Sequence, residues 1–491
     1  MSDWKVIIGL EIHVQARTEA KVFCSCKNSY GDEPNTNVCP VCLAHPGILP
    51  VVNQEAINQI VKAGLMTDSE IARYSKFDRK SYFYPDQPKN FQITQFDLPF
   101  AANGRIPIGG KGLSGKMIEE RYIGMERIHL EEDVGKSTHF DDEGYSVVDY
   151  NRAGIPLLET VSMPEMHSAD EAYAYVQSLQ QIMRYGGISD CDQEKGQFRC
   201  DVNISVHKPG TPFNTKIEIK NLNSTRHIWL SINFEIDRQI RHYEEHPDFM
   251  TNPESRLKQE TRRWNDELQE TVHMRFKETA DDYRYFPEPD LPPVVLSEEQ
   301  IEEFKKIKPM TPLEYRAKFT KDFGVTEYDA HVLTLDKETA DFFMEAASKA
   351  KNPKGVANVM MNQLNSLLSK SSQSLSETKL EPQHIIDLVN LAEAKNLNKK
   401  SYVEILPTLL GEGGSAEAVA KSMKLYIEAV DDSVVEGWVN EAIANNPKAV
   451  EEYKGGKGAA IQFLMGQVMR ASKGQASAPD VIKLLKEKLD N

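Results

Sequence analysis

A carboxylate and an imidazole alternate with aliphatic residues near the N-terminus of the chain. Glu11 and His13 occupy every second position of an alternating segment, so a β-strand would place both on one face and the aliphatic side chains on the other. The same period recurs at Asp201 and Asn203 and in the segment 216–220. Short carboxylates and an amide form the oxygen-rich set that Mg²⁺ takes beside phosphate and water. We therefore expect several strands to share one polar face that holds Mg²⁺ and a phosphate-bearing substrate.

Three consecutive acids, Glu131, Glu132 and Asp133, lie just before Gly135. Like charges so close in sequence repel one another unless a cation or solvent relieves the repulsion. An exposed acidic turn is the simpler interpretation of this run taken alone. The acids on several other alternating segments shift the preference towards a shared cation site.

The segment 149–159 places charged and amide groups directly before an apolar run that contains a carboxylate. Asp149, Asn151 and Arg152 open the segment, and Glu159 lies among aliphatic residues. A buried charge is cheap only when it has a partner. Packing alone does not explain this arrangement, so we interpret Glu159 as a site residue. Asn151 and Arg152 are expected to brace the sheet rather than to react.

Four of the six cysteines form two close pairs, spaced as C-x-C and C-x-x-C: Cys24, Cys26, Cys39 and Cys42. Four thiolates complete a tetrahedral zinc shell without an open position, so zinc here would be structural and would hold the loop 24–42. Reduced thiols without a metal are the alternative. Cys191 and Cys200 lack a metal-like spacing and are expected to be buried thiols.

The segment Gly110–Lys116 has the spacing of a phosphate-binding loop but not its chemistry. Met117 follows it where the motif needs a hydroxyl group for Mg²⁺, and no strand-then-helix pattern frames it. We interpret the segment as a glycine-rich hairpin or loop. Any ATP would then be bound by the carboxylate-bearing strands.

The elements that position these residues divide the 491-residue chain into three predicted parts, within the range of about two to four domains that its length allows. Residues 1–293 mix alternating segments, turns and a few helices, which indicates an α+β domain with a mostly antiparallel sheet. Prolines between 287 and 293 end regular structure there. Residues 294–410 and 411–491 have helical patterns, and glycines 411–414 mark the second boundary.

Two capping boxes predict where helices begin. Ser168 with Glu171 opens a helix that Gly186 can close, and Ser297 with Gln300 opens the helical part of the chain. Further helices are expected over residues 224–246, 338–351, 354–370, 382–395, 415–430 and 461–468.

Composition is that of a globular protein, with 40% hydrophobic and 27% charged residues. The net charge of −16 argues against coating of nucleic acid by bulk electrostatics, so any RNA contact needs local basic patches. We find neither an apolar run long enough to span a bilayer nor a secretory leader pattern. We therefore expect a cytoplasmic protein that makes no membrane contact.

An ordered series of motifs along nearly the whole chain resembles the B-subunit family of the tRNA-dependent Asp/Glu amidotransferases. The series comprises Gly9–His13, Lys76–Asp86, Leu130–Asp133, Asp149–Glu159, Arg199–Asn203, Lys220–Ser224 and Asp281–Pro287. The resemblance implies an α+β catalytic domain with a cradle similar to glutamine synthetase and guanidino kinases, followed by helical and YqeY-like tail domains. It also implies a ligase that uses ATP to amidate Glu or Asp already esterified to tRNA(Gln) or tRNA(Asn). Whether the substrate is Glu-tRNA(Gln), Asp-tRNA(Asn) or both stays open.

The functional residues of the family can be transferred to the matching positions of this sequence. The resemblance then implies a cradle for Mg²⁺ and ATP that is lined by Glu11, His13, Glu132, Glu159 and Asp201. Lys80 and Tyr82 would lie beside it, near the phosphates and the acyl or adenine end of the substrates. From the residues alone, a half-buried aromatic pair of Tyr82 and Tyr84 is an equally good interpretation. A lone histidine such as His13 is more often structural.

A local basic patch is predicted in the tail. Lys454 and Lys457 lie in a glycine-rich segment before a helix, and Arg470 and Lys473 lie at its far end. Backbone amides at a helix N-terminus suit phosphate groups. A capped surface helix with solvated lysines is the alternative, and the resemblance favours tRNA binding.

Ammonia for this reaction would have to come from another chain. Neither a cysteine nucleophile elbow nor the Ser-Ser-Lys pattern of amidases is present. The resemblance implies an amidase-type A subunit that acts as glutaminase and a small C subunit, in a heterotrimer. One alternative is a non-catalytic, zinc-containing RNA-binding protein of translation, which leaves the carboxylate strands without a purpose. The archaeal-type E subunit carries an inserted domain for which this chain has no spare length.

Overall fold

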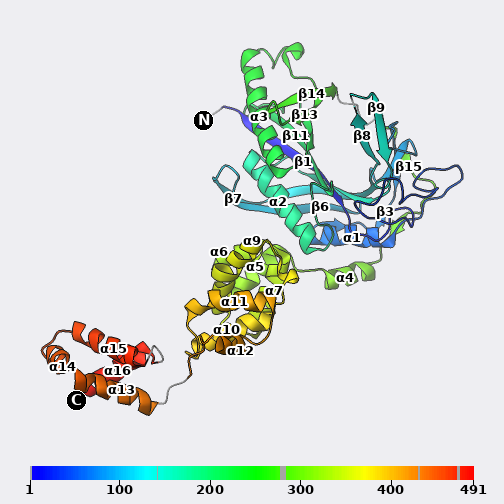
Figure 1. Cartoon of the computed structure of the whole chain (residues 1–491). Coiled ribbons are helices and arrows are strands. Elements are labelled where there is room, and N and C mark those ends of the chain that lie inside the picture. The colour runs from blue at the N-terminus through cyan, green and yellow to red at the C-terminus, as the bar shows by residue number, and fades with distance from the viewer. Residues whose placement is uncertain (1–2, 141, 277–282, 429–431, 473–475, 491) are drawn as a thin grey trace. The chain divides into compact units, whose positions relative to one another are not determined.

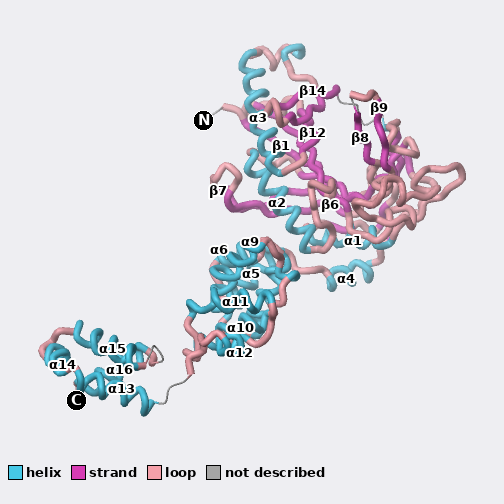
Figure 2. Tube along the Cα trace, in the orientation of Figure 1, coloured by secondary structure: helices cyan, strands magenta, loops and turns pink. Residues whose placement is uncertain are grey.

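The computed structural model describes residues 3–140, 142–276, 283–428, 432–472 and 476–490. The chain divides into two compact units, Met1–Pro312 and Leu313–Asn491. Figure 2 shows that the described strands all belong to the first unit and that the second unit is built from helices.

A long, mostly antiparallel sheet is the centre of the first unit (Figure 1). Among the described residues it has nine strands in the order β14-β13-β12-β11-β1-β10-β7-β6-β2, and only β12 and β13 pair in parallel. This confirms the predicted α+β domain, whereas its likeness to the glutamine synthetase cradle stays a prediction. The strands are β1 (Lys5–Gln15), β2 (Glu70–Ile71), β6 (Ala101–Lys111), β7 (Met117–Glu132), β10 (Pro156–Ser162), β11 (Phe198–His207), β12 (Ile217–Leu222), β13 (Glu260–Asn265) and β14 (Glu270–Phe276).

Smaller sheets flank the long one. A three-stranded sheet has the order β15-β4-β5, and its strand β5 contacts β7 of the long sheet. Two further pairs are β16 with β3 and β8 with β9. The bounds are β3 (Tyr74–Ser75), β4 (Asp78–Ser81), β5 (Phe91–Thr94), β8 (Lys136–Phe140), β9 (Tyr145–Asp149), β15 (Phe286–Pro287) and β16 (Val294–Val295).

The two faces of the long sheet differ in chemistry, as the alternating sequence predicts. Leu10 of β1 lies opposite Val202 of β11, and both are buried. Val206, on the same face of β11, packs against Tyr243 of helix α3 (Thr225–Glu245). Helices α1 (Gln54–Met66) and α2 (Ala169–Tyr185) also contact strands of this sheet (Figure 1). The helices therefore cover the aliphatic face, and the polar residues of the same strands lie on the other face.

The predicted helix starts are confirmed, with one difference in detail. The Ser168 hydroxyl oxygen accepts the Glu171 backbone N–H at 3.2 Å and caps α2. The Glu171 carboxylate accepts the backbone N–H of His167 instead of that of Ser168, and it also pairs with Arg121. Helix α4 (Glu298–Ile307) has the complete capping box that Ser297 predicts. Helix α3 matches the expected 224–246.

Replacing Ser168 with alanine is expected to destabilise the first turn of α2 by about 1 kcal/mol, because one backbone N–H loses its acceptor. Amide hydrogen exchange of that turn should become about fivefold faster. Ser168→Thr retains the acceptor oxygen and should exchange like the wild type. Equal exchange in Ser168→Ala and the wild type would contradict the assigned cap.

The second unit contains most of the predicted helices, and one of them is shorter than expected. The expected helix 354–370 runs as α8, a π-helical segment and α9. The expected helix 415–430 is wrong in its second half, because α12 ends at Ser422 and Lys424 adopts a φ of 60°. Residues 429 and 430 lie outside the described residues. The helices are α5 (Pro312–Phe323), α6 (Glu327–Leu333), α7 (Lys337–Lys349), α8 (Pro353–Val359), α9 (Asn365–Ser371), α10 (Pro382–Glu393), α11 (Tyr402–Gly411), α12 (Ala416–Ser422), α13 (Asp432–Asn445), α14 (Pro447–Lys454), α15 (Ala459–Ala471) and α16 (Ala478–Leu489).

Helix packing continues past both predicted domain boundaries. Helix α4 contacts α1, so the first compact unit extends beyond residue 293 to Pro312. Helix α12 contacts α10 and α11, so the glycines near 411 do not end that group of helices. Buried residues between Val435 and Leu489 form a core of their own. Across the described parts of the chain, every helix is too short or too polar to cross a bilayer.

Candidate active site

Three neighbouring strands align an imidazole, a carboxylate and a second imidazole on the polar face. Glu159 of β10 lies opposite His13 of β1 on one side and His129 of β7 on the other. One oxygen of Glu159 is 3.4 Å from Nε2 of His13 and 3.2 Å from Nε2 of His129. Glu159 is 6% exposed. A single buried carboxylate therefore bridges two rings from two different strands.

Glu131 completes this row from strand β7. It lies two residues after His129, on the same face of the strand. Its two carboxylate oxygens are each 3.7 Å from an Nε2 atom, one from His13 and the other from His129. The Thr94 hydroxyl of β5 donates a hydrogen bond of 3.0 Å to Glu131. The three-stranded sheet therefore contributes to the site.

A second group of possible ligands lies beside the row. Glu11 of β1 is opposite Asp201 of β11. Glu11, His13 and Asp201 each offer a ligand atom, and these atoms lie within 4.8 Å of one another. Lys220 of β12 places Nζ 2.5 Å from an Asp201 oxygen. Two oxygen-rich groups thus meet at His13, an arrangement that fits a divalent cation and phosphate oxygens.

The electrostatics of the row follow from burial and close charges. Burial would raise the pKa of Glu159, but the charge of His129 and hydrogen bonds from both rings hold it well below its usual range. Burial lowers the pKa of His129, yet the charge of Glu159 raises it to about 9. The pKa of Glu11 is raised, first by the charge of Glu159 and then by burial. The negative charge of Glu159 and the hydrogen bonds from the two rings thus stabilise one another.

Lys80 faces these acids without an ion pair of its own among the described residues. Its Nζ atom is 5.1 Å from the ring centroid of Tyr283 and 5.9 Å from that of Tyr82. Burial would lower the pKa of Lys80, but the charges of Glu131, Glu159 and Glu11 raise it. The two tyrosine rings attract the ammonium group and leave its N–H donors available for an anion. Lys80 and Tyr82 therefore lie near the acids, and their contact with the substrates stays a prediction. Neither Tyr82 nor Tyr84 belongs to a described strand, so the two do not form a strand pair.

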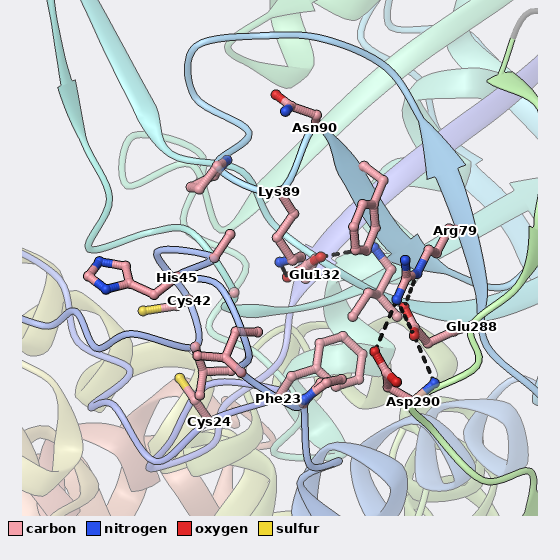
Figure 3. A pocket seen from close by; sticks show the side chains of 18 residues that line it. Phe23, Cys24, Cys42, His45, Arg79, Lys89, Asn90, Glu132, Glu288 and Asp290 are labelled. Carbon is pink, nitrogen blue, oxygen red and sulfur yellow. Dashed lines mark hydrogen bonds and ion pairs between the residues drawn. The ribbon is translucent and has the colours of Figure 1, made fainter.

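Glu132, which the resemblance places in this cradle, lies on the other side of the strand. Its carboxylate is 2.6 Å from Nζ of Lys89 and accepts the Ile93 backbone N–H at 2.9 Å. It lines a cavity of about 320 Å³ beside Arg79 and Cys24 (Figure 3). Because side chains alternate along β7, Glu131 takes the place predicted for Glu132.

The acidic run is buried, which excludes the exposed-turn alternative. Asp133 is 2% exposed, and its oxygens lie 2.8 and 3.0 Å from the guanidinium nitrogens of Arg199. Gln15 donates to the same carboxylate at 2.9 Å. Arg152 donates to the backbone carbonyls of residues 134 and 135. These contacts match the bracing role expected of Arg152.

Comparison with known proteins matches both parts of the chain. Residues 6–302 match the family model described as the GatB/GatE catalytic domain, and residues 341–489 match the model described as the GatB domain. The chain belongs to the GatB family. It is 43% identical to a protein of Carboxydothermus hydrogenoformans over 100% of this chain and 99% of that one. Relatives in Staphylococcus haemolyticus (44% identical, 99% of each chain) and Crocosphaera subtropica (43% identical, 100% of this chain and 98% of that one) are similar over their whole length. All three are named as the B subunit of aspartyl/glutamyl-tRNA(Asn/Gln) amidotransferase.

The glycine-rich segment of this GatB-family chain is a hairpin turn, as predicted. Gly110 and Lys111 end strand β6, and residues 112–116 connect it to β7. Gly110 and Gly115 adopt positive φ angles of 80° and 86°. Ser114 donates its backbone N–H to Asp170 at 3.0 Å. The turn therefore packs against helix α2 and is not a phosphate-binding loop.

The four predicted cysteines come together in this member of the GatB family. Their Sγ atoms lie within 4.8 Å of one another: Cys24, Cys26, Cys39 and Cys42. Sγ of Cys42 is 4.0 Å from that of Cys26 and 3.9 Å from that of Cys39. Zinc–sulfur bonds of about 2.3 Å in a tetrahedron place the sulfurs about 3.8 Å apart. The spacing fits a zinc ion.

The first half of the segment 149–159 ties the cysteine loop to the sheet. Asp149 accepts the backbone N–H of Asn35 at 3.0 Å, and Asn151 accepts that of Asn37 at 2.8 Å. The Asn35 side chain bonds back to the backbone of residues 148 and 150. In this GatB-family segment the clamp on the cysteine loop, at the end of β9 and in the following turn, thus directly precedes strand β10 with the buried carboxylate of Glu159, a role that the sequence does not reveal.

Three of the four tail residues predicted for tRNA binding lie near the two ends of helix α15. Lys454 ends α14, and Lys457 follows with an ion pair to Glu452 at 3.7 Å. Arg470 lies in the last turn of α15 and is exposed. The length of α15, about 20 Å, separates the two groups. Lys473 lies outside the described residues.

Proposed function

We propose that this chain activates the side-chain carboxylate of Glu or Asp esterified to tRNA(Gln) or tRNA(Asn), as one component of an ATP-dependent amidotransferase. The observation that carries the proposal is the row of Glu131, Glu159 and His129, all buried, with the half-buried His13. This row faces Lys80, whose ammonium group forms no ion pair among the described residues. A site with this charge pattern suits a phosphoryl group approached by a second anion.

The proposed reaction has two steps. A carboxylate oxygen of the aminoacyl side chain attacks the γ-phosphorus of ATP, and ADP leaves with the electrons of the broken bond. The nitrogen of ammonia then attacks the acyl carbon, phosphate leaves, and a proton is released. Mg²⁺ held by Glu11, His13 and Asp201, with Glu131 and Glu159 adjacent, would screen the repulsion between the two anions.

Individual side chains have distinct roles in this proposal. Lys80 donates hydrogen bonds to the anionic substrates, because no carboxylate of the described residues lies within ion-pair distance of it. Lys220 holds Asp201 at 2.5 Å, and Arg199 holds Asp133 at the edge of the site. These pairs fix the acids before substrate binds, which lowers the reorganisation that the reaction requires.

A partner chain supplies the ammonia. Burial raises the pKa of the Cys191 thiol to about 12 and that of Cys200 well above its usual range, so neither is a thiolate nucleophile. The other four cysteines belong to the cluster. The family resemblance points to an amidase-type A subunit as glutaminase and a small C subunit, together forming a heterotrimer with this chain.

Zinc in the cysteine cluster is proposed as a structural ion. Lys21 is fully buried, with Nζ 3.1 Å from the Tyr150 carbonyl oxygen and 3.6 Å from Sγ of Cys42. No carboxylate of the described residues pairs with it. A buried ammonium group is costly unless negative charge lies near it, and metal-bound thiolates supply that charge. This favours bound zinc over neutral thiols.

The proposal is tested by phosphate release from ATP in the purified complex with ammonia supplied. Release should require Glu-tRNA(Gln) or Asp-tRNA(Asn), and correctly charged Gln-tRNA(Gln) should not stimulate it. Amidated aminoacyl-tRNA should accumulate in equal amounts with phosphate. Absence of stimulation by either misacylated tRNA would reject the proposed function. The non-catalytic RNA-binding alternative is not favoured, since it gives the buried row no role.

Removing positive charges from the tail is expected to weaken tRNA binding in proportion to the number of phosphate contacts that are lost. The double change Lys454→Ala and Lys457→Ala should lower affinity several-fold and reduce the slope of log affinity against log salt by about 1 to 2. Arg470→Ala should reduce the same slope by about 1. Lys370→Ala, in helix α9, is the matched control and should leave the slope unchanged. An unaltered slope in the tail variants would contradict tRNA binding there.

A further inference from the structure

The two histidines that flank Glu159 differ in how far solvent reaches them. The side chain of His13 is 17% exposed, whereas that of His129 is 5% exposed. His13 also shares a group of possible ligands with Glu11 and Asp201. His13 therefore lies on the open side of the acids, and His129 lies on their closed side.

The polar contacts of the His129 ring go to the two acids of the row. Its Nε2 atom is 3.2 Å from an oxygen of Glu159 and 3.7 Å from an oxygen of Glu131. Its Nδ1 atom is buried and has no hydrogen-bond partner among the described residues. Burial removes the hydration of an imidazole, and a nitrogen left without a partner adds to that cost. A ring kept in this position indicates a role towards the acids and not packing alone.

The oxygens of the two acids are divided between the closed side and the open side. Oε2 of Glu131 accepts the Thr94 hydroxyl at 3.0 Å and faces His129, whereas Oε1 of Glu131 faces His13. The shortest contacts of Glu159 with the two rings both use Oε2, and neither uses Oε1. His129 thus holds one oxygen of each acid and leaves the other oxygen of each acid for a ligand.

The backbone fixes the distance between the His129 ring and the acids. In the pairing of β7 with β10, His129 lies directly opposite Glu159. On the other side of the strand, the backbone N–H of Leu130 donates to the side-chain oxygen of Gln95 at 3.1 Å. The position of the ring is therefore set by strand pairing and not by a loop.

We propose that His129 is a positioning residue that orients the carboxylates of Glu131 and Glu159 for a divalent cation. The inference rests on the proposed function, which places Mg²⁺ beside these acids. Carboxylates that bind a metal are commonly held by hydrogen bonds from neighbouring groups, and loss of such a partner typically weakens metal binding about 10- to 100-fold. His129 supplies this partner from the closed side of the site.

The inference is tested by Mn²⁺ binding to the purified complex, measured by electron paramagnetic resonance without tRNA or ATP. Mn²⁺ is the probe because it takes the same oxygen-rich sites as Mg²⁺. The Mn²⁺ that the wild type binds and Glu131→Gln loses reports the site. His129→Met should weaken this binding about tenfold or more, because no N–H faces the acids.

His129→Gln is the matched variant, since glutamine and methionine have similar length and only glutamine keeps an N–H donor. It should bind Mn²⁺ within about threefold of the wild type. His139→Met is the control outside the site, because His139 is exposed on β8 and contacts Ser146. This control should bind Mn²⁺ like the wild type.

Turnover supplies a second measurement that separates positioning from chemistry. The Mg²⁺ concentration that gives half-maximal phosphate release should rise about tenfold in His129→Met. At saturating Mg²⁺, kcat should stay within about threefold of the wild type. A fall in kcat with unchanged Mg²⁺ dependence would overturn the inference, because it would place His129 at the reacting groups.

Three binding results would also overturn it. Equal Mn²⁺ affinity in His129→Met and the wild type would show that the ring does not act on the site. Equal weakening by His129→Met and His129→Gln would indicate a packing defect. A wild-type complex without a Mn²⁺ site that depends on Glu131 would remove the cation that the acids are proposed to hold. Mn²⁺ binding needs neither tRNA nor turnover, so its failure is distinguishable from failure of the proposed function.

Discussion

Glu131→Gln is expected to lower the rate of phosphate release in the purified complex by about a hundredfold or more at saturating ATP, Glu-tRNA and ammonia. The substitution keeps the shape of the side chain but removes a charge that lies 3.7 Å from both His13 and His129. Groups that are fixed in advance around a reacting phosphoryl group typically contribute about 10²- to 10³-fold to kcat. The measurement is single-turnover phosphate release.

The control for this change is another acid on the same strand. Glu126 lies on β7, is exposed and pairs with its neighbour Arg127. Glu126→Gln should therefore retain turnover within about twofold, as surface ion pairs contribute little. Asp201→Ala should be as inactive as Glu131→Gln, since it belongs to the adjoining ligand group. Undiminished turnover in either variant would remove that residue from the active site.

Cys42→Ser is expected to weaken zinc binding by the complex. The wild-type chain should contain one zinc ion, and the variant should bind zinc at least tenfold more weakly in competition with a chelator, because one of four sulfur ligands is lost. The loop 24–42 should become sensitive to protease, since few apolar side chains hold it. Zinc content by metal analysis and limited proteolysis are the two measurements.

Cys191→Ser is the matched control for the cysteine cluster. Cys191 is a buried thiol outside the cluster, so this variant should retain its zinc and the protease resistance of the loop. A wild-type chain without zinc would reject the metal assignment. A Cys42→Ser chain that holds zinc as tightly as the wild type would reject Cys42 as a ligand.

Local periodicity makes much of the site predictable. The sequence correctly predicts that Glu11, His13 and Asp201 share one face, because alternation in a strand depends only on neighbouring residues. The same holds for the four cysteines, whose pairs are close in sequence, and for the caps of α2 and α4. The hairpin Gly110–Lys116 is also predictable. The sequence has Met117 where a phosphate-binding loop needs a hydroxyl group, and no helical pattern follows.

The sequence by itself determined which side-chain types line the polar face, the strands that carry them, and the family they indicate. Tertiary structure decided which groups meet. It placed Glu131 in the row and Glu132 beside Lys89, because the choice depends on how β7 pairs with β10. It added His129, which looks like an isolated histidine in sequence, and brought Tyr283 and Tyr285 to Lys80 across about two hundred residues. Alternation defines a face, whereas distances within that face arise only when strands from separate parts of the chain pair.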